Sequence, residues 1–221
     1  AGGSREYIKP LSARFKNGIR LSTPVLQVTR KQWVNGFLQV SIDTVKGTEY
    51  FDEVVFACHS NQALALLSDP SPQEVTILSA IPYSRNEVVL HTDTSMLPRH
   101  PLTWSSWNVQ VDGADREQPV LTYNMNILQN LKSRHTWCVT LNNTANIREE
   151  CIHGVYHYEH PVFSLKGIAA QERWGEINGI RQTWFCGAWW RNGFHEDGVW
   201  SAKRVAEDMK LQQNRQLALA V

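Results

Sequence analysis

The 221 residues of this chain include 22 basic and 21 acidic side chains, which give a formal net charge of +1. Hydrophobic residues make up 42% of the sequence and charged residues 19%, a composition typical of a globular protein. The balanced charge excludes the basic footprint of a nucleic-acid-binding protein, and no apolar run reaches the ~20 residues of a transmembrane helix. The polar, glycine-rich start does not resemble a signal peptide, so we expect a cytoplasmic protein.

The chain begins with a predicted helix. Ser4 can cap a helix over residues 5–15, in which apolar side chains recur at helical spacing. Pro10 lies inside this range and predicts a short or kinked helix, because proline cannot donate the helical backbone hydrogen bond.

A β-rich stretch follows the helix. We expect strands at residues 19–21 and 25–28, interrupted by Pro24, and another at 37–45, where apolar and polar side chains alternate. Residues 53–58 form a short and nearly continuous apolar run, which fits a strand buried on both faces of a parallel sheet.

Helices are expected at residues 60–67 and 73–80, and the residue pattern changes from helical to β-forming after them. Short runs of β-forming residues, separated by turn residues, predict a largely antiparallel region from about 83 to 158. Its strand candidates are residues 87–91, 102–107, 120–123 and 138–141, and a short helix is expected at 127–131.

Residues 183–206 form the strongest local pattern in the sequence. A short strand at 182–186 ends before Gly187, a loop containing Gly193 follows, and an amphipathic helix is expected over about 198–213. Glycines let the backbone approach a ligand closely, and the free N–H groups of a helix start bind anions. A capped helix with an acidic first turn explains the same residues equally well, so the residues alone leave both interpretations open.

This segment resembles the C-terminal FAD motif of the flavin-containing amine oxidase superfamily, in which a strand ending in glycine leads through an aromatic loop to a helix. The string FCGAWW…GFHEDG is more closely similar to a branch of bacterial predicted NAD/FAD-binding proteins. Other strings resemble that branch in the same order, among them AGGSREYI, FDEVVFACHSNQALALL, VVLHTDTSMLP, YNMNILQNL and YEHPVF. The resemblance covers nearly the whole chain.

The resemblance implies FAD as the cofactor and roles for individual positions. Val25 corresponds to a residue whose backbone contacts the adenine, and Gly187 to one that meets the ribityl and pyrophosphate region. Most amine oxidases have an acidic residue directly after that glycine, where this chain has Ala188. The cofactor-binding residues that the resemblance implies are Val25, Ala57, Gly187, Ala188, Gly193, Phe194, His195, Asp197, Gly198 and Val199.

At the flavin itself, the resemblance places Phe194 against the ring and the helix start at 197–199 near the flavin O2 atom. We expect Phe194, together with Trp189 or Trp190, to form an aromatic wall of the pocket. The sequence names no catalytic acid or base.

The resemblance also implies the fold class, α/β (α+β): the C-terminal part of a two-domain FAD-binding fold of the glutathione-reductase-like Rossmann type, with a mixed or antiparallel-sheet substrate domain. Residues 1–64 and 171–221 would belong to the FAD-binding domain, and residues 65–170 to the substrate domain. The GxGxxG fingerprint that binds the pyrophosphate in this family does not occur in the sequence. We therefore expect that this chain needs a missing N-terminal half, in the same protein or as a second polypeptide.

Histidine and cysteine residues give weaker signals. Cys151, His153, His157 and His160 could bind Zn²⁺ if they shared a helix face, but the glycine, tyrosines and proline among them favour extended structure. We therefore predict no metal site. The four cysteines lack CxxC spacing, which is typical of reduced thiols in the cytosol.

Together these features predict the C-terminal half of an FAD-dependent oxidoreductase of the amine-oxidase type, in which the flavin accepts a hydride from a C–N or C–C bond. One alternative is a flavin-dependent desaturase of an apolar acyl or isoprenoid-like substrate, which the aromatic-rich middle region would suit. Another is a truncated, non-catalytic module that lacks the GxGxxG half. The expected partners are a small-molecule or lipid-like substrate and the missing N-terminal half.

Overall fold

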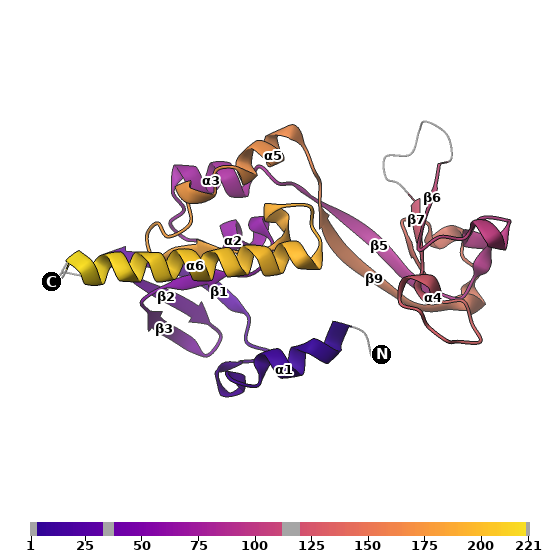
Figure 1. The fold of residues 1–221 in the computed structure, drawn as a ribbon, viewed down its shortest axis with the longest axis horizontal. Coiled ribbons are helices and arrows are strands. Elements are labelled where there is room, and N and C mark those ends of the chain that lie inside the picture. The colour runs from indigo at the N-terminus through magenta and orange to yellow at the C-terminus, as the bar shows by residue number, and fades with distance from the viewer. Residues whose placement is uncertain (1–3, 33–37, 112–119, 220–221) are drawn as a thin grey trace. The chain divides into compact units, whose positions relative to one another are not determined.

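The computed structural model describes residues 4–32, 38–111 and 120–219, which form two compact units (Figure 1). The first unit comprises Ala1–Lys16 and Ser84–His160, and the second comprises Asn17–Tyr83 and Pro161–Val221. Each unit therefore combines two separate stretches of the chain. Helices and mainly antiparallel sheets make this a mixed α/β fold, as the sequence predicts at that level.

Residues 65–83 and 161–170 pack with the second unit. The assignment of 1–64 and 171–221 to an FAD-binding domain, and of 65–170 to a substrate domain, concerns function and stays a prediction. No helix in the described ranges combines the length and the apolar character that crossing a bilayer requires.

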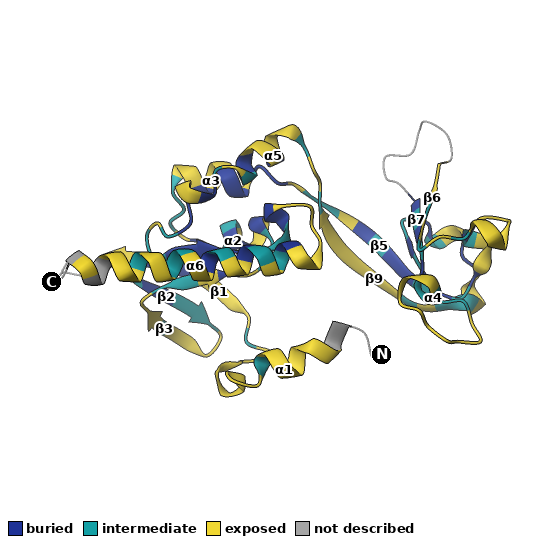
Figure 2. Cartoon of the chain, in the orientation of Figure 1, coloured by how far each residue is buried: buried dark blue, intermediate teal, exposed yellow. Residues whose placement is uncertain are grey.

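The first unit is built on a five-stranded sheet with the order β6-β7-β8-β5-β9. The pairs β6–β7, β7–β8 and β5–β8 are antiparallel, and β9 lies at an edge and is exposed along most of its length (Figure 2). The strands are β5 (Tyr83–His91), β6 (Trp107–Gln110), β7 (Val120–Asn124), β8 (Cys138–Leu141) and β9 (Ile152–Pro161), and the short helices are α1 (Ile8–Ser12) and α4 (Met125–Leu128).

The buried face of this sheet is rich in polar side chains. Thr122 on β7 lies opposite Thr140 on β8, and their hydroxyl oxygens are 2.8 Å apart. His91 Nε2 lies 2.7 Å from Thr140 Oγ1, and all three side chains are buried. Burial lowers the pKa of His91, although the nearby Asp93 carboxylate opposes that effect. A hydrogen-bonded row of polar groups therefore crosses three strands inside the unit.

At one end of this row, Asp93 forms an ion pair with Arg148. Its carboxylate accepts hydrogen bonds from Arg148 Nε and Nη2, both at 3.1 Å, and from the Arg148 backbone N–H at 3.0 Å. Burial alone would raise the pKa of Asp93, but the hydrogen bonds from Arg148 outweigh it and hold that pKa well below its usual range.

The opposite face of the same sheet is apolar and partly open. The register places Val109 opposite Leu121, Leu121 opposite Leu141, and Leu141 opposite Val88. Exposure rises toward the β6 edge, from 7% at Val88 to 62% at Val109. The side chains of this apolar face are Trp107, Val109, Leu121, Tyr123, Val139, Leu141, Val88 and Leu90.

The second unit contains two sheets and most of the helical residues. An antiparallel sheet has the order β1-β2-β3, and β4 pairs in parallel with β10. Helix α6 is the longest of the described helices (yellow in Figure 1). The elements are β1 (Val25–Gln32), β2 (Leu38–Thr44), β3 (Gly47–Phe51), β4 (Val54–Phe56), β10 (Thr183–Phe185), α2 (Ser60–Leu66), α3 (Pro72–Leu78), α5 (Leu165–Gln171) and α6 (His195–Leu219).

A single apolar core joins these elements. Val28 from β1, Phe56 from β4, Ile77 from α3 and Phe185 from β10 belong to one buried cluster, to which α6 contributes Val205. Phe56 and Phe185 stack with ring centroids 5.3 Å apart. The strands and helices of the second unit are therefore held mainly by burial of apolar surface.

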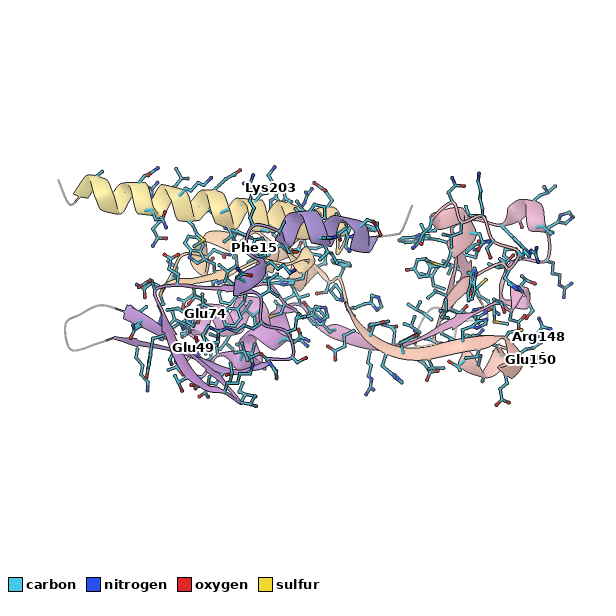
Figure 3. All side chains as sticks on the ribbon, turned by 90° about the horizontal axis from the view of Figure 1, so that it is seen from below. Phe15, Glu49, Glu74, Arg148, Glu150 and Lys203 are labelled. Atoms are coloured by element: carbon cyan, nitrogen blue, oxygen red, sulfur yellow. The ribbon has the colours of Figure 1, made fainter. Side chains whose placement is uncertain are left out.

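One ion pair lies inside this core region. The Arg30 side chain is 0% exposed and the Glu74 side chain 2% exposed, and the two groups bond in a bidentate manner (Glu74 is labelled in Figure 3). Arg30 Nη1 also donates to Thr183 Oγ1 at 3.2 Å, and Arg30 Nε donates to Asp69 Oδ1 at 3.1 Å. One guanidinium thus ties β1 to α3, to the loop after α2 and to the start of β10.

Most predicted elements are present, but several differ in place or extent. Residues 19–21 are not a strand, because Arg20 pairs with the Glu49 side chain and Ser22 then turns the chain with φ of +51°. The strand predicted at 102–107 begins only at Trp107, after a short 3-10 turn at Pro101–Thr103. The helix expected over 5–15 is α-helical only over Ile8–Ser12, and its first turn is a 3-10 helix.

Candidate functional site

Two parallel strands end side by side in the second unit. Phe185 of β10 lies opposite Phe56 of β4 at the last register position. The chain leaves β4 through Ala57 and leaves β10 through Cys186 and Gly187, so both exits lie at the carboxyl edge of the pair. In open α/β sheets, ligands bind outside the carboxyl ends of the strands. This edge is therefore the candidate site.

Helix α6 begins beside this edge and is fixed there by a hydroxyl group. Ser201 Oγ accepts a hydrogen bond from the Gly187 backbone N–H at 2.9 Å and donates one to the Gly198 carbonyl at 2.9 Å. The helix begins earlier than the sequence predicts, at His195. Its first turns, with the positive end of the helix macrodipole, therefore lie next to the end of β10.

Gly187 is required by close packing within the chain itself. A Cβ atom at this position would lie 2.4 Å from Trp189 Nε1 and 2.6 Å from Trp189 Cδ1. The Trp189 ring is buried, and its Nε1 donates to the Cys58 carbonyl at 3.0 Å. The indole thus links the exit of β4 to the loop that follows β10, and only glycine leaves room for it.

Trp189 and Trp190 belong to a buried tryptophan cluster. Their rings stack at 4.3 Å, the Trp190 ring lies 4.7 Å from that of Trp174, and the Arg204 guanidinium lies 4.4 Å above Trp174. Trp189 and Trp190 are 3% and 2% exposed, so the expectation that either forms a wall of a ligand pocket is wrong. Phe194, which is 56% exposed, remains accessible to a ligand.

The first turn of α6 contains a carboxylate of its own. Asp197 is buried, and its Oδ2 accepts a hydrogen bond from the Phe194 backbone N–H at 3.0 Å. Its Oδ1 lies 3.7 Å from Arg191 Nε. The carboxylate of Asp197 therefore uses one of the N–H groups at the helix start that an external anion would otherwise bind. The acidic residue of a capping box acts in the same way. His195 and Glu196 are exposed in the same turn.

The structure brings several of the other predicted residues together. The Ala188 carbonyl accepts hydrogen bonds from the backbone N–H groups of Arg191 and Gly193, each at 3.1 Å. Gly193 has φ of +86°, a conformation that favours glycine. A Cβ atom at Gly198 would first meet the Ala188 backbone nitrogen, at 3.9 Å, so the start of α6 and this loop are neighbours.

The remaining predicted residues are exposed and apolar. Ala57 directly follows β4, and Val199 lies on the first turns of α6 with 53% of its surface exposed. Val25 begins β1 opposite Thr44, in a different sheet from the strand ends.

Sequence reasoning missed three residues that shape this edge: Cys58, Gln171 and Ser201. Gln171 Nε2, on α5, donates to the carbonyls of Trp189 at 2.7 Å and Arg191 at 2.8 Å and so holds the loop. Burial raises the pKa of the Cys58 thiol, which keeps it protonated and a poor nucleophile. No sequence signal identifies these partners, because Cys58 and Gln171 are distant from the loop in the chain, and Ser201, although it lies in the same segment, is of an ordinary residue type.

The first unit offers no comparable constellation. His153, His157 and His160 follow one another along β9, and no group of three His, Cys, Asp or Glu side chains in the described ranges could hold a metal ion. A pocket of about 730 Å³ lies near β6, but the amides of Asn108 and Asn143 that line it bond to the chain itself.

No protein-family model and no curated protein sequence matches the chain. Among solved structures, it is similar to a protein from Exiguobacterium sp. 255-15 provisionally named protoporphyrinogen oxidase, with 16% identity and a TM-score of 0.61 over 93% of this chain and 51% of that one. A fatty acid isomerase from P. acnes that produces CLA shows 14% identity and a TM-score of 0.58, over 92% and 51% of the two chains. Cyclohexylamine oxidase from Brevibacterium oxydans IH-35A shows 13% identity and a TM-score of 0.58, over 95% and 53%.

At these identities the likeness establishes the fold, and the fold is that of flavin amine oxidase family members. The resemblance predicted from the sequence is confirmed at this level. The chain spans about half the length of the structures it matches.

Proposed function

We propose that this chain forms the flavin-edge part of an FAD-dependent oxidoreductase of the amine-oxidase type, the C-terminal half of such an enzyme. The observation that supports the proposal most is the meeting of two parallel strand ends, a glycine loop and the start of a 25-residue helix at one edge. Such an edge suits a ligand that carries negative charge at one end.

The helix start and the small residues at this edge support a flavin as the ligand. The start of α6 would stabilise the negative charge that develops at the N1–C2=O edge of a reduced flavin, and the exposed Phe194 would pack on its ring. Gly198, where a Cβ atom would meet only the Ala188 backbone nitrogen within 4 Å, and the small side chain of Ala188 leave room beside the same surface, whereas Gly187 makes room for Trp189. Asp197 would act by holding the loop rigid, because its carboxylate is already engaged with the chain.

When bound, FAD would accept a hydride from a C–N or C–C bond of the substrate. The residues of this chain would orient the flavin edge and exclude water. Val25 and Ala57 would contact the dinucleotide portion, as the resemblance implies, and residues of the first unit would contribute to the substrate domain.

A second candidate is the desaturation of an apolar acyl or isoprenoid-like chain, and one observation favours it. The apolar face of the five-stranded sheet leaves Trp107 and Val109 49% and 62% exposed. An elongated apolar substrate could bury that surface, whereas a small charged amine could not.

Titration with FAD tests the proposal. We expect a bound-flavin absorbance spectrum when this chain is produced together with the polypeptide encoded immediately upstream, joined in frame or co-expressed. A spectrum with the pair but none with this chain alone would mean that the chain is one half of the site. If neither preparation binds FAD, the proposal is wrong and the non-catalytic module is the better interpretation.

A further inference from the structure

Four tryptophan rings form a continuous row beside the strand ends of the second unit. The rings of Trp189 and Trp190 stack with their centroids 4.3 Å apart, and the Trp174 ring follows that of Trp190 at 4.7 Å. The Trp200 ring lies 6.1 Å from that of Trp174. The first three residues are 2–3% exposed, and Trp200 is half-buried. The row therefore leads from the loop after β10 toward the surface of the unit.

The inner end of the row touches the candidate site. Glycine at position 187 leaves the Trp189 indole directly against the backbone, because a Cβ atom there would lie 2.4 Å from Trp189 Nε1. The same Nε1 donates to the Cys58 carbonyl, at the exit of β4, at 3.0 Å. Aromatic rings in contact exchange electrons readily, because their π-systems overlap. An oxidant at this edge that removes one electron would therefore take it from Trp189.

The indole N–H groups of the row have different acceptors. Trp189 and Trp190 each donate to a backbone carbonyl oxygen, which does not take up a proton. Trp174 Nε1 donates instead to Asp208 Oδ2, at 2.9 Å. Loss of an electron makes an indole N–H strongly acidic, and a carboxylate within hydrogen-bond distance can accept its proton. The oxidised form of Trp174 can therefore lose its proton to a neighbouring base.

Helix α6 supplies the charges around Trp174. Trp200, Arg204 and Asp208 are four residues apart and so share one face of the helix. The Arg204 guanidinium lies 4.4 Å from the Trp174 ring and 5.6 Å from that of Trp200, and Arg191 lies 5.0 Å from Trp200. A positive charge opposes a radical cation on either ring. Proton transfer to Asp208 removes this opposition at Trp174, whereas Trp200 lies beside two guanidiniums, so an electron vacancy would stop at Trp174.

We propose that Trp189, Trp190 and Trp174 form a one-electron relay that ends on Trp174, with Asp208 as the proton acceptor. A light-excited flavin at the strand-end edge is the oxidant, and to this extent the inference rests on the proposed function. The further activity is the light-driven, one-electron reduction of the bound cofactor by a soluble reductant of the ascorbate class.

The relay moves one electron and one proton in each cycle. One electron passes from Trp189 to the flavin, the vacancy moves through Trp190 to Trp174, and the Trp174 Nε1 proton passes to Asp208 Oδ2. The soluble reductant then returns one electron to Trp174, and it releases a proton to water as it becomes a radical anion. Asp208 returns its proton to Trp174, so the residues of the relay end in their starting state.

A photo-oxidant attached at the edge tests the relay without a flavin. Phe194→Cys at the exposed loop position is labelled with a ruthenium(II) polypyridyl maleimide, in a chain that also carries Cys151→Ser. Burial raises the pKa of the Cys58 thiol, so that thiol reacts slowly with the label. A laser flash with a soluble electron acceptor then generates the ruthenium(III) oxidant at the edge.

Transient absorption and electron paramagnetic resonance follow the radical that forms. We expect a deprotonated tryptophan radical in the labelled chain and its loss in Trp174→Phe. Asp208→Asn keeps an oxygen that accepts the Trp174 hydrogen bond but takes up no proton, so the signal should shift to the protonated radical cation. A purely structural Asp208 would give no such shift.

Two matched variants serve as controls, and both should leave the radical unchanged. Glu207→Gln removes the neighbouring carboxylate on α6, and Trp137→Phe removes a tryptophan of the first unit. Circular dichroism of every variant checks that the helices persist. A radical that survives in Trp174→Phe, or that stays deprotonated in Asp208→Asn, would overturn the proposal. The absence of any tryptophan radical in the labelled chain would overturn it as well.

A blue-light flash on the FAD-loaded preparation, made with the upstream polypeptide, separates the two proposals. We expect the same deprotonated Trp174 radical. Bound FAD without this radical would contradict the relay and leave the proposed function standing. The radical in the ruthenium-labelled chain, with no FAD binding in the presence of the upstream polypeptide, would contradict the proposed function and leave the electron path standing.

Discussion

In the second unit, strands and helices bury aromatic and aliphatic side chains around Phe56 and Phe185, with one ion pair between Arg30 and Glu74. In the first unit, the five-stranded sheet buries the row of His91 and two threonines and leaves an apolar face partly open. Apolar side chains dominate the core of the second unit, whereas the inside of the first combines this polar row with apolar side chains such as Val89 and Val120. A partly exposed apolar face is the kind of surface that a ligand or another chain covers.

The largest effect is expected at the ion pair of the second unit. Glu74→Ala leaves the buried Arg30 guanidinium with Asp69 as its remaining carboxylate partner, which should lower the free energy of unfolding by about 3 kcal/mol. Urea denaturation of the purified chain measures this change. Glu49→Ala is the control, since Glu49 pairs with Arg20 at the surface and its loss should leave the urea midpoint unchanged (Figure 3). Equal effects of the two variants would mean that burial of the pair is unimportant.

The next effect concerns two glycines at the candidate site. Gly187→Ala places a Cβ atom against the buried Trp189 indole and should cost about 1–3 kcal/mol of stability. Gly198→Ala has open space around the new Cβ atom and lies in a helix, so it should stabilise the chain by roughly 0.5–1 kcal/mol. Thermal unfolding of both variants measures the difference, and a stabilising Gly187→Ala would refute the packing argument.

A third pair of variants compares the two faces of the first-unit sheet. Thr140→Val keeps the shape of the side chain but removes the hydroxyl between His91 and Thr122, and it should cost about 1–3 kcal/mol. Val109→Thr on the open apolar face should change stability by less than about 0.5 kcal/mol. Urea unfolding followed by the NMR signals of the first unit measures both. A loss of stability in Val109→Thr larger than about 0.5 kcal/mol would show that the apolar face stabilises the unit.

The smallest effect is a dependence of the first unit on pH. Burial lowers the pKa of His91, so the unfolded chain binds this proton more readily than the folded chain does. Stability should therefore fall as the pH falls below the ordinary histidine pKa of about 6.5, and fall further below about pH 4, where the lowered pKa of Asp93 acts in the same direction.

His91→Gln should remove the first part of this decline and Asp93→Asn the second. Urea midpoints of the first unit over a series of pH values measure both changes. An unaltered pH profile in His91→Gln would show that another group controls the decline.

The sequence predicts strand positions well where apolar and polar residues alternate. The strand at Cys138–Leu141 is the one expected, and 25–28 lies within β1. Alternation shows which residues share a face, but it does not show which face is buried. The pattern therefore does not show that Thr122 and Thr140 lie inside the unit. The error at 102–107 has a local cause, because Trp104 Nε1 donates to the Pro98 carbonyl and holds a turn there.

At the candidate site, the sequence predicts the strand, the glycine loop and the helix, but it does not show every contact that their residues make within the chain. Gly187 accommodates an indole of the same chain, and Asp197 engages the chain's own N–H group. These roles depend on Cys58, Gln171 and Ser201, which pattern and spacing do not connect with the loop. The assignment of individual residues to FAD stays a prediction.

The fluorescence of the tryptophan cluster beside the strand ends can report on ligand binding at that edge. Indole emission depends on the surroundings of the ring, and the stacked rings of Trp189 and Trp190 are buried in the loop that follows Gly187. A flavin bound at that edge would quench their emission by energy transfer, whereas Trp107, on the apolar face of the first unit, would respond mainly to whatever covers that face. Two classes of tryptophan, assigned by single Trp→Phe replacements, would thus report separately on the two surfaces of this chain.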